Sequence, residues 1–246
     1  MKNKYFLALF FTLFILNACK KESGPVTKEV PFTVTTYDSL GGYDPTGLPF
    51  YLTTSDVISP GLISFINTNL PDGKNLPKLH PELFASAAVA DINVTASSNV
   101  YVTFVTASAG VPNTVGFYTY PTGHPPASAQ DVSTITYIFP SAGNYTPLHP
   151  GDKVKIGNFA AGTTIAFVLF ENSWNLATGQ INDNAVHFCT DDILNPEIDP
   201  KLKRHAVLLN YIPENKVLIS FDDTNRTSPD CDNDFNDVVI YCTVTP

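Results

Sequence analysis

The chain has 246 residues and a formal net charge of −9, with 14 lysines and arginines against 23 aspartates and glutamates. Proteins that bind nucleic acid use lysine and arginine to neutralise phosphates, so this balance argues against a nucleic-acid partner. The 20 prolines and 14 glycines are typical of many short strands joined by ordered turns.

The N-terminus predicts an exported lipoprotein. Lys2 and Lys4 precede an apolar run over residues 5–16, which is too short to span a bilayer but suits a signal-peptide core. The run leads into Leu16-Asn17-Ala18-Cys19, which resembles the lipobox of bacterial lipoproteins. The resemblance implies that residues 1–18 are removed and that Cys19 is lipidated, with palmitate among its acyl chains. The alternative is an ordinary secretory signal with a chance cysteine.

The residues after Cys19 indicate where the anchor would lie. Lys20 stands where an aspartate retains many lipoproteins at an inner membrane, so we expect an outer-membrane anchor in the bacterial envelope. Residues 19–30 are polar and contain Gly24 and Pro25, which predicts a tether. No later segment is long and apolar enough to cross a bilayer, so the lipid would provide the membrane association. The orientation toward the periplasm or the cell surface is left open.

Residues 31–246 predict a single domain, an all-β antiparallel sandwich of jelly-roll type. Ser59 and Pro60 supply a cap and a first-turn proline, and helical apolar spacing follows, so we expect one short helix near residues 60–67. Elsewhere apolar and polar residues alternate, as in strands. The clearest of these stretches are residues 100–104, 115–120, 135–139, 153–156, 164–170, 206–211, 217–221 and 238–244. In the last stretch we expect Val238, Ile240 and Val244 to face the core.

An acidic segment separates the last two predicted strands. Six aspartates fall within sixteen residues, and Arg226 is the only cation among them: Asp222, Asp223, Asp230, Asp232, Asp234 and Asp237. Carboxylates held this close in an ordered loop repel one another unless a cation lies between them. Calcium takes about six to eight hard oxygen ligands, so it is the ion that this composition suits. The alternative is a solvated acidic turn. An EF-hand is excluded because its glycine and its closing glutamate are missing.

Several runs of the chain carry a family resemblance. The segments VYVTFV, LHPGDKVKIGNFAAGTTIAFVLFEN, LNPE, RHAVLL and ISFDD…CDNDFNDVVIYCTV resemble a bacterial domain of unknown function that occurs in LruC-like lipoproteins and other surface proteins. The resemblance covers roughly residues 48–245. Its closing motif is an acidic pair at a strand end, a short loop, and Gly-Asp-x-Asp-aromatic-Asn-Asp. Cys231 stands in place of the usual glycine and Asp222 in place of the usual glutamate.

The resemblance implies a calcium site at the closing motif and no particular activity. Carried over residue by residue, it implies five ligands: Asp222, Asp223, Asp232, Asp234 and Asp237. Phe235 is expected to pack inward and to fix the loop. His205 matches a family histidine at the start of a strand, where we expect it to form structural hydrogen bonds.

The other candidate residues give weaker signals. Cys189 and Cys231 both lie near acidic loops and either form a disulfide or stay free, while Cys242 is expected to be a small buried residue. The histidines show no zinc spacing. Glu171 lies close to Trp174, a combination that would bind sugar or act as an acid, although a loop glutamate beside an anchoring aromatic is the commoner case.

Two functions of different class remain. The first is a non-enzymatic, calcium-stabilised binding or adhesion module that presents loops to a glycan or a protein partner. The second is a hydrolase, or an accessory subunit, that acts on polysaccharide through Glu171 or the carboxylates of the acidic segment. We expect the first, with no catalytic residues. The sequence contains no nucleophile elbow, phosphate-binding loop or dinucleotide fingerprint.

Overall fold

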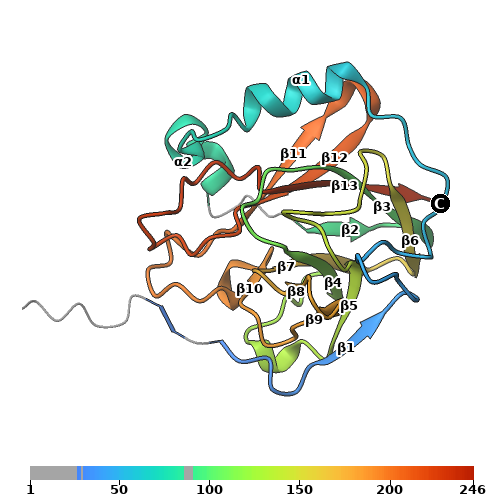
Figure 1. Ribbon diagram of the computed structural model, residues 1–246, viewed down its shortest axis with the longest axis horizontal. Helices are drawn as coiled ribbons and strands as arrows, with labels where there is room; N and C mark the ends of the chain where they lie inside the picture. The colour runs from blue at the N-terminus through green and yellow to red at the C-terminus, as the bar shows by residue number, and fades with distance from the viewer. Residues whose placement is uncertain (1–26, 29, 86–90) are drawn as a thin grey trace, which may run out of the picture.

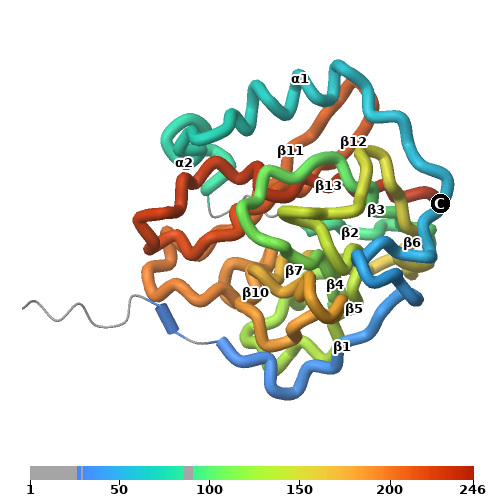
Figure 2. Tube along the Cα trace, in the orientation of Figure 1, coloured from blue at the N-terminus to red at the C-terminus, as the bar shows by residue number. Residues whose placement is uncertain are grey.

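The computed structural model describes residues 27–28, 30–85 and 91–246 (Figures 1 and 2). The expected signal peptide, Cys19 and most of the expected tether lie outside the described residues. Among the helices that the structure describes, none has the length and hydropathy needed to cross a membrane.

Two β-sheets pack face to face, which confirms the predicted all-β sandwich. The first contains, in spatial order, β1 (Thr36–Ser39), β5 (Thr134–Phe139), β4 (Thr114–Pro121), β7 (Thr163–Phe170) and β10 (His187–Cys189), with β2 (Ile92–Val94) also paired to β7. The second contains β11 (Ala206–Tyr211), β12 (Lys216–Phe221), β13 (Val238–Thr245), β3 (Ser98–Ala107) and β6 (Lys153–Phe159). A small hairpin of β8 (Trp174–Asn175) and β9 (Gln180–Ile181) follows β7.

The main core lies between the two sheets. Alternate residues of β13, among them Val238 and Ile240, meet residues such as Phe167 of β7 there, all fully buried. The intervening residues Val239 and Tyr241 belong to a second apolar cluster on the outer face of the five-stranded sheet. Both faces of the last strand are therefore buried over residues 238–242. The strict period of two in a strand accounts for this division.

A helical segment covers that outer face. Helix α1 (Pro60–Asn69) lies along β11 and β12 at the top of Figure 1, and Leu62 and Ile66 contribute to the second cluster. The expected cap is present, because the Ser59 hydroxyl accepts a hydrogen bond from the Leu62 N–H at 3.0 Å. A second helix, α2 (Leu76–Leu79), and a 3₁₀ turn, η1 (Pro81–Phe84), follow it.

Three other 3₁₀ turns lie among the described residues: η2 (Ala129–Asp131), η3 (Asp192–Leu194) and η4 (Ile212–Glu214). Most of the described chain outside the strands is irregular or turn structure.

The sandwich is mostly antiparallel, as predicted, although β1 pairs with β5 in parallel. Details of the helices and of the last strand were wrong. The helix near residue 60 reaches Asn69, and α2 makes a second helix with its own cap, in which Asn75 Oδ1 accepts from the Lys78 N–H at 3.2 Å. Val244 is 37% exposed rather than in the core. It lies near the end of β13, where the strand lines a surface pocket instead of the space between the sheets.

Candidate metal centre

The acidic loop, residues 222–237, connects β12 to β13. These two strands are antiparallel neighbours, with Phe221 opposite Val238, so the two ends of the loop meet at one point. The Asp237 N–H donates to the Phe221 carbonyl at 3.1 Å and closes the loop. This register places Asp222 and Asp223 beside Asp237, which explains how residues distant in the loop come together.

Asp223 and Asp237 form the most closely joined pair of carboxyl groups in the loop. The Asp223 N–H donates to Asp237 Oδ2 at 2.8 Å, and Asn113 Nδ2 donates to Asp223 Oδ2 at 2.6 Å. Asp223 is only 4% exposed. Burial, followed by repulsion from Asp223, raises the pKa of Asp237 to about 9. Burial also raises the pKa of Asp223, with a contribution from the charge of Asp232.

Asp222 is buried beside the pair, with 1% of its surface exposed. Its backbone N–H donates to the His205 carbonyl at 2.9 Å, and its own carbonyl accepts from His205 Nδ1 at 3.1 Å. Burial raises the pKa of Asp222 to about 6, although the neighbouring His205 lowers it. The Cys231 thiol lies within 3.4 Å of Asp222 Oδ1 and donates to it.

His205 joins the loop to a second buried carboxylate. Its Nε2 lies 2.9 Å from Glu197 Oε1, and its Nδ1 lies 3.1 Å from the Asp222 carbonyl, so each ring nitrogen faces an oxygen. Burial opposes ionisation of Glu197, but the hydrogen bond and charge of His205 bring its pKa below the ordinary value. The predicted structural role of His205 is confirmed. Glu197 Oε2 is buried without a hydrogen-bond partner among the described residues.

Asp234 and Asp232 occupy the next turn of the loop. Asp234 is 1% exposed, and its Oδ2 accepts from the Gly73 N–H at 2.7 Å and from Asn236 Nδ2 at 2.9 Å. Burial raises the pKa of Asp234 to about 6, and the charges of Asp232 and Asp72 add to the shift. Asp232 is exposed, and its Oδ1 accepts from the Asp234 N–H at 3.3 Å. Asp234 therefore fixes the loop to the connection between α1 and α2.

Phe235 anchors the acidic loop to the apolar cluster on the outer face of the five-stranded sheet. It is fully buried, as predicted, and meets the Phe84 ring edge to face with centroids 5.0 Å apart. The Ser220 hydroxyl donates to its carbonyl. Phe235 has φ of 59° and Asn233 has φ of 60°, both in the left-handed region. Such conformations cost roughly 1–3 kcal/mol each and persist only where the surroundings hold them.

The cation within the loop does not neutralise it. Arg226 Nε donates to Asn233 Oδ1 at 2.8 Å, and its Nη1 donates to the Arg204 carbonyl at 3.0 Å. Its guanidinium carbon lies 5.4 Å from the Phe235 ring centroid. In the described part of the chain, no ion pair within 4.0 Å includes a carboxylate of the acidic loop. His205 offsets part of the charge of Asp222, and the remaining charges of the loop have no paired cation there.

The residues present suit calcium in their chemistry. They offer hard carboxylate oxygens, and each oxygen that accepts one N–H keeps a further lone pair. The structure brings Asp222, Asp223 and Asp237 together at the base of the loop and leaves Asp232 and Asp234 on the adjoining turn. Within residues 27–28, 30–85 and 91–246, no three His, Cys, Asp or Glu side chains are already grouped closely enough to hold a metal ion.

Three residues of the site escaped the sequence analysis. Asn113 and Gly73 are 110 and 161 residues from the aspartates that they contact, and nothing in their local sequence marks them. Glu197 lies in the LNPE segment that contributes to the family resemblance, so that resemblance was the available signal.

Of the two alternatives left open for Cys189 and Cys231, the structure has the free thiols. The three cysteines in the described part of the chain, Cys189, Cys231 and Cys242, are all free. Cys189 lies in the apolar cluster on the outer face of the six-stranded sheet, whereas Cys231 contacts Asp222 in the acidic loop. Cys242 is buried in the main core, as expected.

The Glu171 and Trp174 pair has a structural arrangement. Trp174 is 2% exposed and meets the Tyr43 ring edge to face at 5.6 Å, so it does not offer a stacking surface to a ligand. Glu171 follows β7, and burial raises its pKa, with a further contribution from the charge of Asp223. The glutamate therefore belongs to the electrostatic surroundings of the acidic loop.

The raised carboxyl pKa values predict a pH dependence of stability. A carboxyl whose pKa is higher in the folded state than in the unfolded state stabilises the fold at low pH, and this contribution is lost as pH rises through the folded pKa. For Asp237 this window extends from about 4 to about 9. In excess chelator, the free energy of unfolding should therefore fall between pH 7 and pH 9, by up to about 1.4 kcal/mol per pH unit.

Differential scanning calorimetry at pH 7, 8 and 9 measures this slope. Asp237→Asn keeps an acceptor for the Asp223 N–H but does not titrate, so the slope should become shallower in that variant. Equal slopes in the two proteins would contradict the assignment to Asp237. The window above pH 7 also avoids His187, because burial lowers the pKa of that residue to about 4.

The fold and the loop together define a class: a β-sandwich with a buried, carboxylate-rich connection between two adjacent strands. Residues 159–245 match the model of a family described as a domain of unknown function, DUF4114. The matched segment begins at the end of β6 and includes β7, Glu197, His205, the acidic loop and β13. Comparisons with curated proteins and with solved structures gave no match.

Proposed function

We propose that this protein is a non-enzymatic binding module of the bacterial envelope, held at the outer membrane by lipid on Cys19 and stabilised by calcium in the acidic loop. Its partner would be a glycan or a surface protein. The observation that supports the ion is the group of carboxyl groups at the base of the loop: burial raises the pKa values of Asp222, Asp223 and Asp237, and the charges of Asp223 and Asp222 raise that of Asp237 further. In the described part of the chain, none of the three forms an ion pair within 4.0 Å. Asp232 and Asp234 would complete the ligand set.

The proposed ion has a structural role. Folding brings the carboxylates together, and a bound divalent cation would replace their repulsion with attraction. The loop connects two central strands and contacts the α1–α2 connection through Gly73. Calcium in the loop would therefore stabilise the outer face of the five-stranded sheet together with the helical segment that covers it. The critical test is the response of the melting temperature to calcium removal, with Asp232→Asn as the ligand variant and Asp38→Asn as its control.

A polysaccharide hydrolase is the second candidate. The observation that favours it is Glu171, because a half-buried carboxyl with a raised pKa near a second carboxyl, Asp223, has the property of a general acid. Three surface pockets, of about 280, 450 and 580 Å³, are lined by other residues and include neither Glu171 nor an acidic-loop carboxylate. A binding module needs no catalytic pair in a cleft, and we favour it for that reason.

The lipid anchor gives a second testable prediction. Cys19→Ala removes the thiol that would be acylated, so the variant should be found in the soluble fraction or should keep residues 1–18. Ultracentrifugal separation of membranes, followed by intact mass measurement, distinguishes these outcomes from the lipidated wild type. Cys231→Ser, which alters a cysteine of the acidic loop, should partition with membranes as the wild type does. Membrane partitioning of Cys19→Ala at the wild-type level would rule out the anchor.

A further inference from the structure

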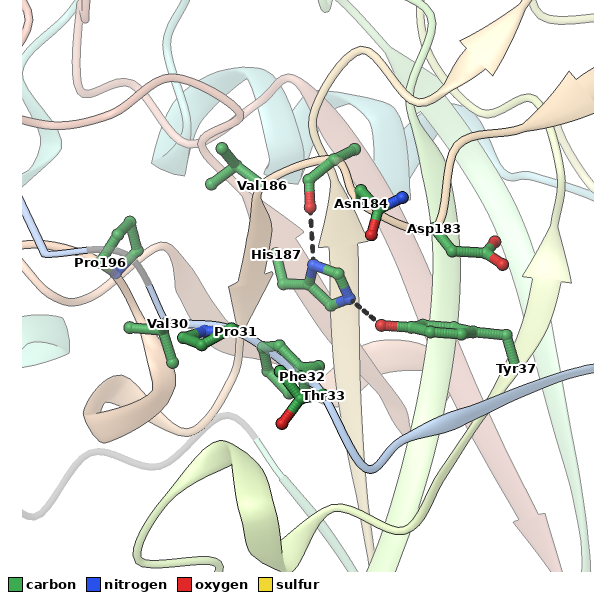
Figure 3. Close-up of a pocket in the computed structure, with 11 residues that line it drawn as sticks. Val30, Pro31, Phe32, Thr33, Tyr37, Asp183, Asn184, Val186, His187 and Pro196 are labelled. Carbon is green, nitrogen blue, oxygen red and sulfur yellow. Dashed lines mark hydrogen bonds between the residues drawn. The ribbon is translucent and has the colours of Figure 1, made fainter.

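A pocket of about 280 Å³ lies where the chain enters the sandwich (Figure 3). Its walls come from residues 30–33, from Tyr37 of β1, and from residues 183–187 at the start of β10. Thr27 and Lys28 pair with the chain near Pro196, which completes the wall. No residue of the acidic loop lines this pocket, so it is separate from the proposed calcium site.

The hydrogen bonds of His187 determine what the pocket offers. His187 Nδ1 lies 2.7 Å from the Ala185 carbonyl, which only accepts, so Nδ1 carries the ring proton. Nε2 is then an acceptor, and the Tyr37 hydroxyl donates to it at 2.9 Å, as the dashed lines in Figure 3 show. The proton of Tyr37 is thereby engaged, and its oxygen keeps a lone pair as an acceptor. The pocket therefore presents Tyr37 as an acceptor.

Asp183 and Asn184 lie at the edge of the pocket, as does Thr33, whose hydroxyl accepts a hydrogen bond from Gln130. Asp183 is exposed and accepts from the Tyr137 hydroxyl through Oδ1, which leaves Oδ2 without a hydrogen-bond partner among the described residues. The side-chain amide of Asn184 makes no hydrogen bond in the described part of the chain. No lysine or arginine lines the pocket. The lining thus combines free acceptors and one amide with apolar groups such as Pro31 and Val186.

We infer that this pocket binds one neutral sugar residue of a glycan. A sugar ring has hydroxyl groups that donate to acceptors and a C–H face that packs on apolar side chains, and the pocket supplies both kinds of partner. The volume suits one ring. The lone carboxylate without a lining cation disfavours acidic sugars and phosphates, which it repels. This inference rests on the proposed function as a binding module and specifies the glycan among its possible partners.

A cationic ligand is the alternative, because aromatic rings and a carboxylate also attract cations. A cation must reach the open face of a ring. Phe32 stacks on His187 with centroids 4.3 Å apart, and Tyr37 stacks on Tyr137 at 6.0 Å, so each ring has one face covered. Phe32 is also only 9% exposed. The rings therefore do not form an open aromatic cage, and the observations favour the sugar.

The test is saturation-transfer NMR on the full-length lipidated protein in nanodiscs of phosphatidylethanolamine and phosphatidylglycerol. The probes are glucose, galactose, mannose and N-acetylglucosamine, with choline and glucuronate in separate samples. Saturation transfer to at least one neutral sugar, and none to choline or glucuronate, is the expected result. Failure of all four neutral sugars would overturn the inference, and transfer to choline or glucuronate alone would overturn it in favour of a charged ligand.

Two variants locate the binding. Val186 is 43% exposed, and Val186→Arg should obstruct the pocket and engage Asp183 without disturbing the core, so affinity for the sugar should fall about tenfold or more. Asn184→Ala should weaken it by about tenfold through loss of the amide. Ile198→Arg is the matched control, because Ile198 is 57% exposed and lines the neighbouring 450 Å³ pocket instead. Wild-type affinity in Val186→Arg would place the sugar elsewhere.

This experiment is independent of the calcium site. The wild type and Val186→Arg should show the same change in melting temperature on calcium removal. A retained calcium response without sugar binding would overturn the glycan inference alone. Sugar binding without any calcium response would overturn the ion and leave the pocket in place.

Discussion

In excess chelator the protein should melt about 5–10 °C below its melting temperature in millimolar calcium. An ion that binds only the folded state adds about 2.7 kcal/mol of stability at a hundredfold excess over its Kd. For a chain of this size, each kcal/mol corresponds to about 2–4 °C. The physical cause is the group of buried carboxylates around Asp222, Asp223 and Asp237, which folding forces together. Readdition of calcium should restore the higher melting temperature in scanning calorimetry.

Two exposed aspartates provide the decisive comparison. Asp232→Asn keeps an acceptor for the Asp234 N–H, so the stability of the calcium-free protein should hardly change, while the loss of a charged ligand should remove most of the calcium response. Asp38→Asn alters an exposed carboxylate of β1, in the other sheet, and should respond as the wild type does. Identical melting temperatures of the wild type in chelator and in calcium would contradict the calcium site and support the alternative, a solvated acidic turn.

Phe235→Ala should lower the free energy of unfolding by about 3–5 kcal/mol, which corresponds to about 6–20 °C in melting temperature. The ring is fully buried against Phe84 and Arg226, so its removal leaves a cavity beneath the acidic loop. Alanine at φ of 59° relieves none of the backbone strain, because it also disfavours the left-handed region. The calcium response should shrink as well, since Phe235 holds the backbone between two of the proposed ligands.

The control for this variant is another phenylalanine. Phe50 is 72% exposed, so Phe50→Ala should change the stability by less than about 0.5 kcal/mol. Urea titration of both variants, with intrinsic fluorescence as the signal, gives the two free energies. Similar losses in Phe50→Ala and Phe235→Ala would show that the ring beneath the loop has no special importance.

The sequence was informative where a local pattern determines structure. The alternation in residues 238–242 predicted the inward positions of Val238 and Ile240, and Ser59 with Pro60 predicted the start of α1. The inward packing of Phe235 followed from the family motif. Each of these features depends on residues close together in the chain, or on a motif that retains their spacing.

Features that depend on distant contacts were not predictable. The parallel pairing of β1 joins residues about a hundred positions apart, and no turn signal specifies it. Val244 continues the alternation of β13, yet it is 37% exposed and lines a surface pocket. The amide of Asn113 and the N–H of Gly73 reach the acidic loop from other elements. Cysteine spacing gave no indication that Cys189 and Cys231 belong to different clusters.

The position of β13 also affects when this protein can fold. Although it is formed by residues 238–245, this strand lies in the middle of its sheet, between β12 and β3. Strands β3 and β12 cannot be joined into one sheet until the ribosome has made those residues, and pairing across such a long stretch of chain is slow. A nascent chain therefore remains without a complete core until synthesis has passed Val238. For the exported chain that we propose, which would cross a membrane in extended form, this delay would keep the polypeptide competent for translocation.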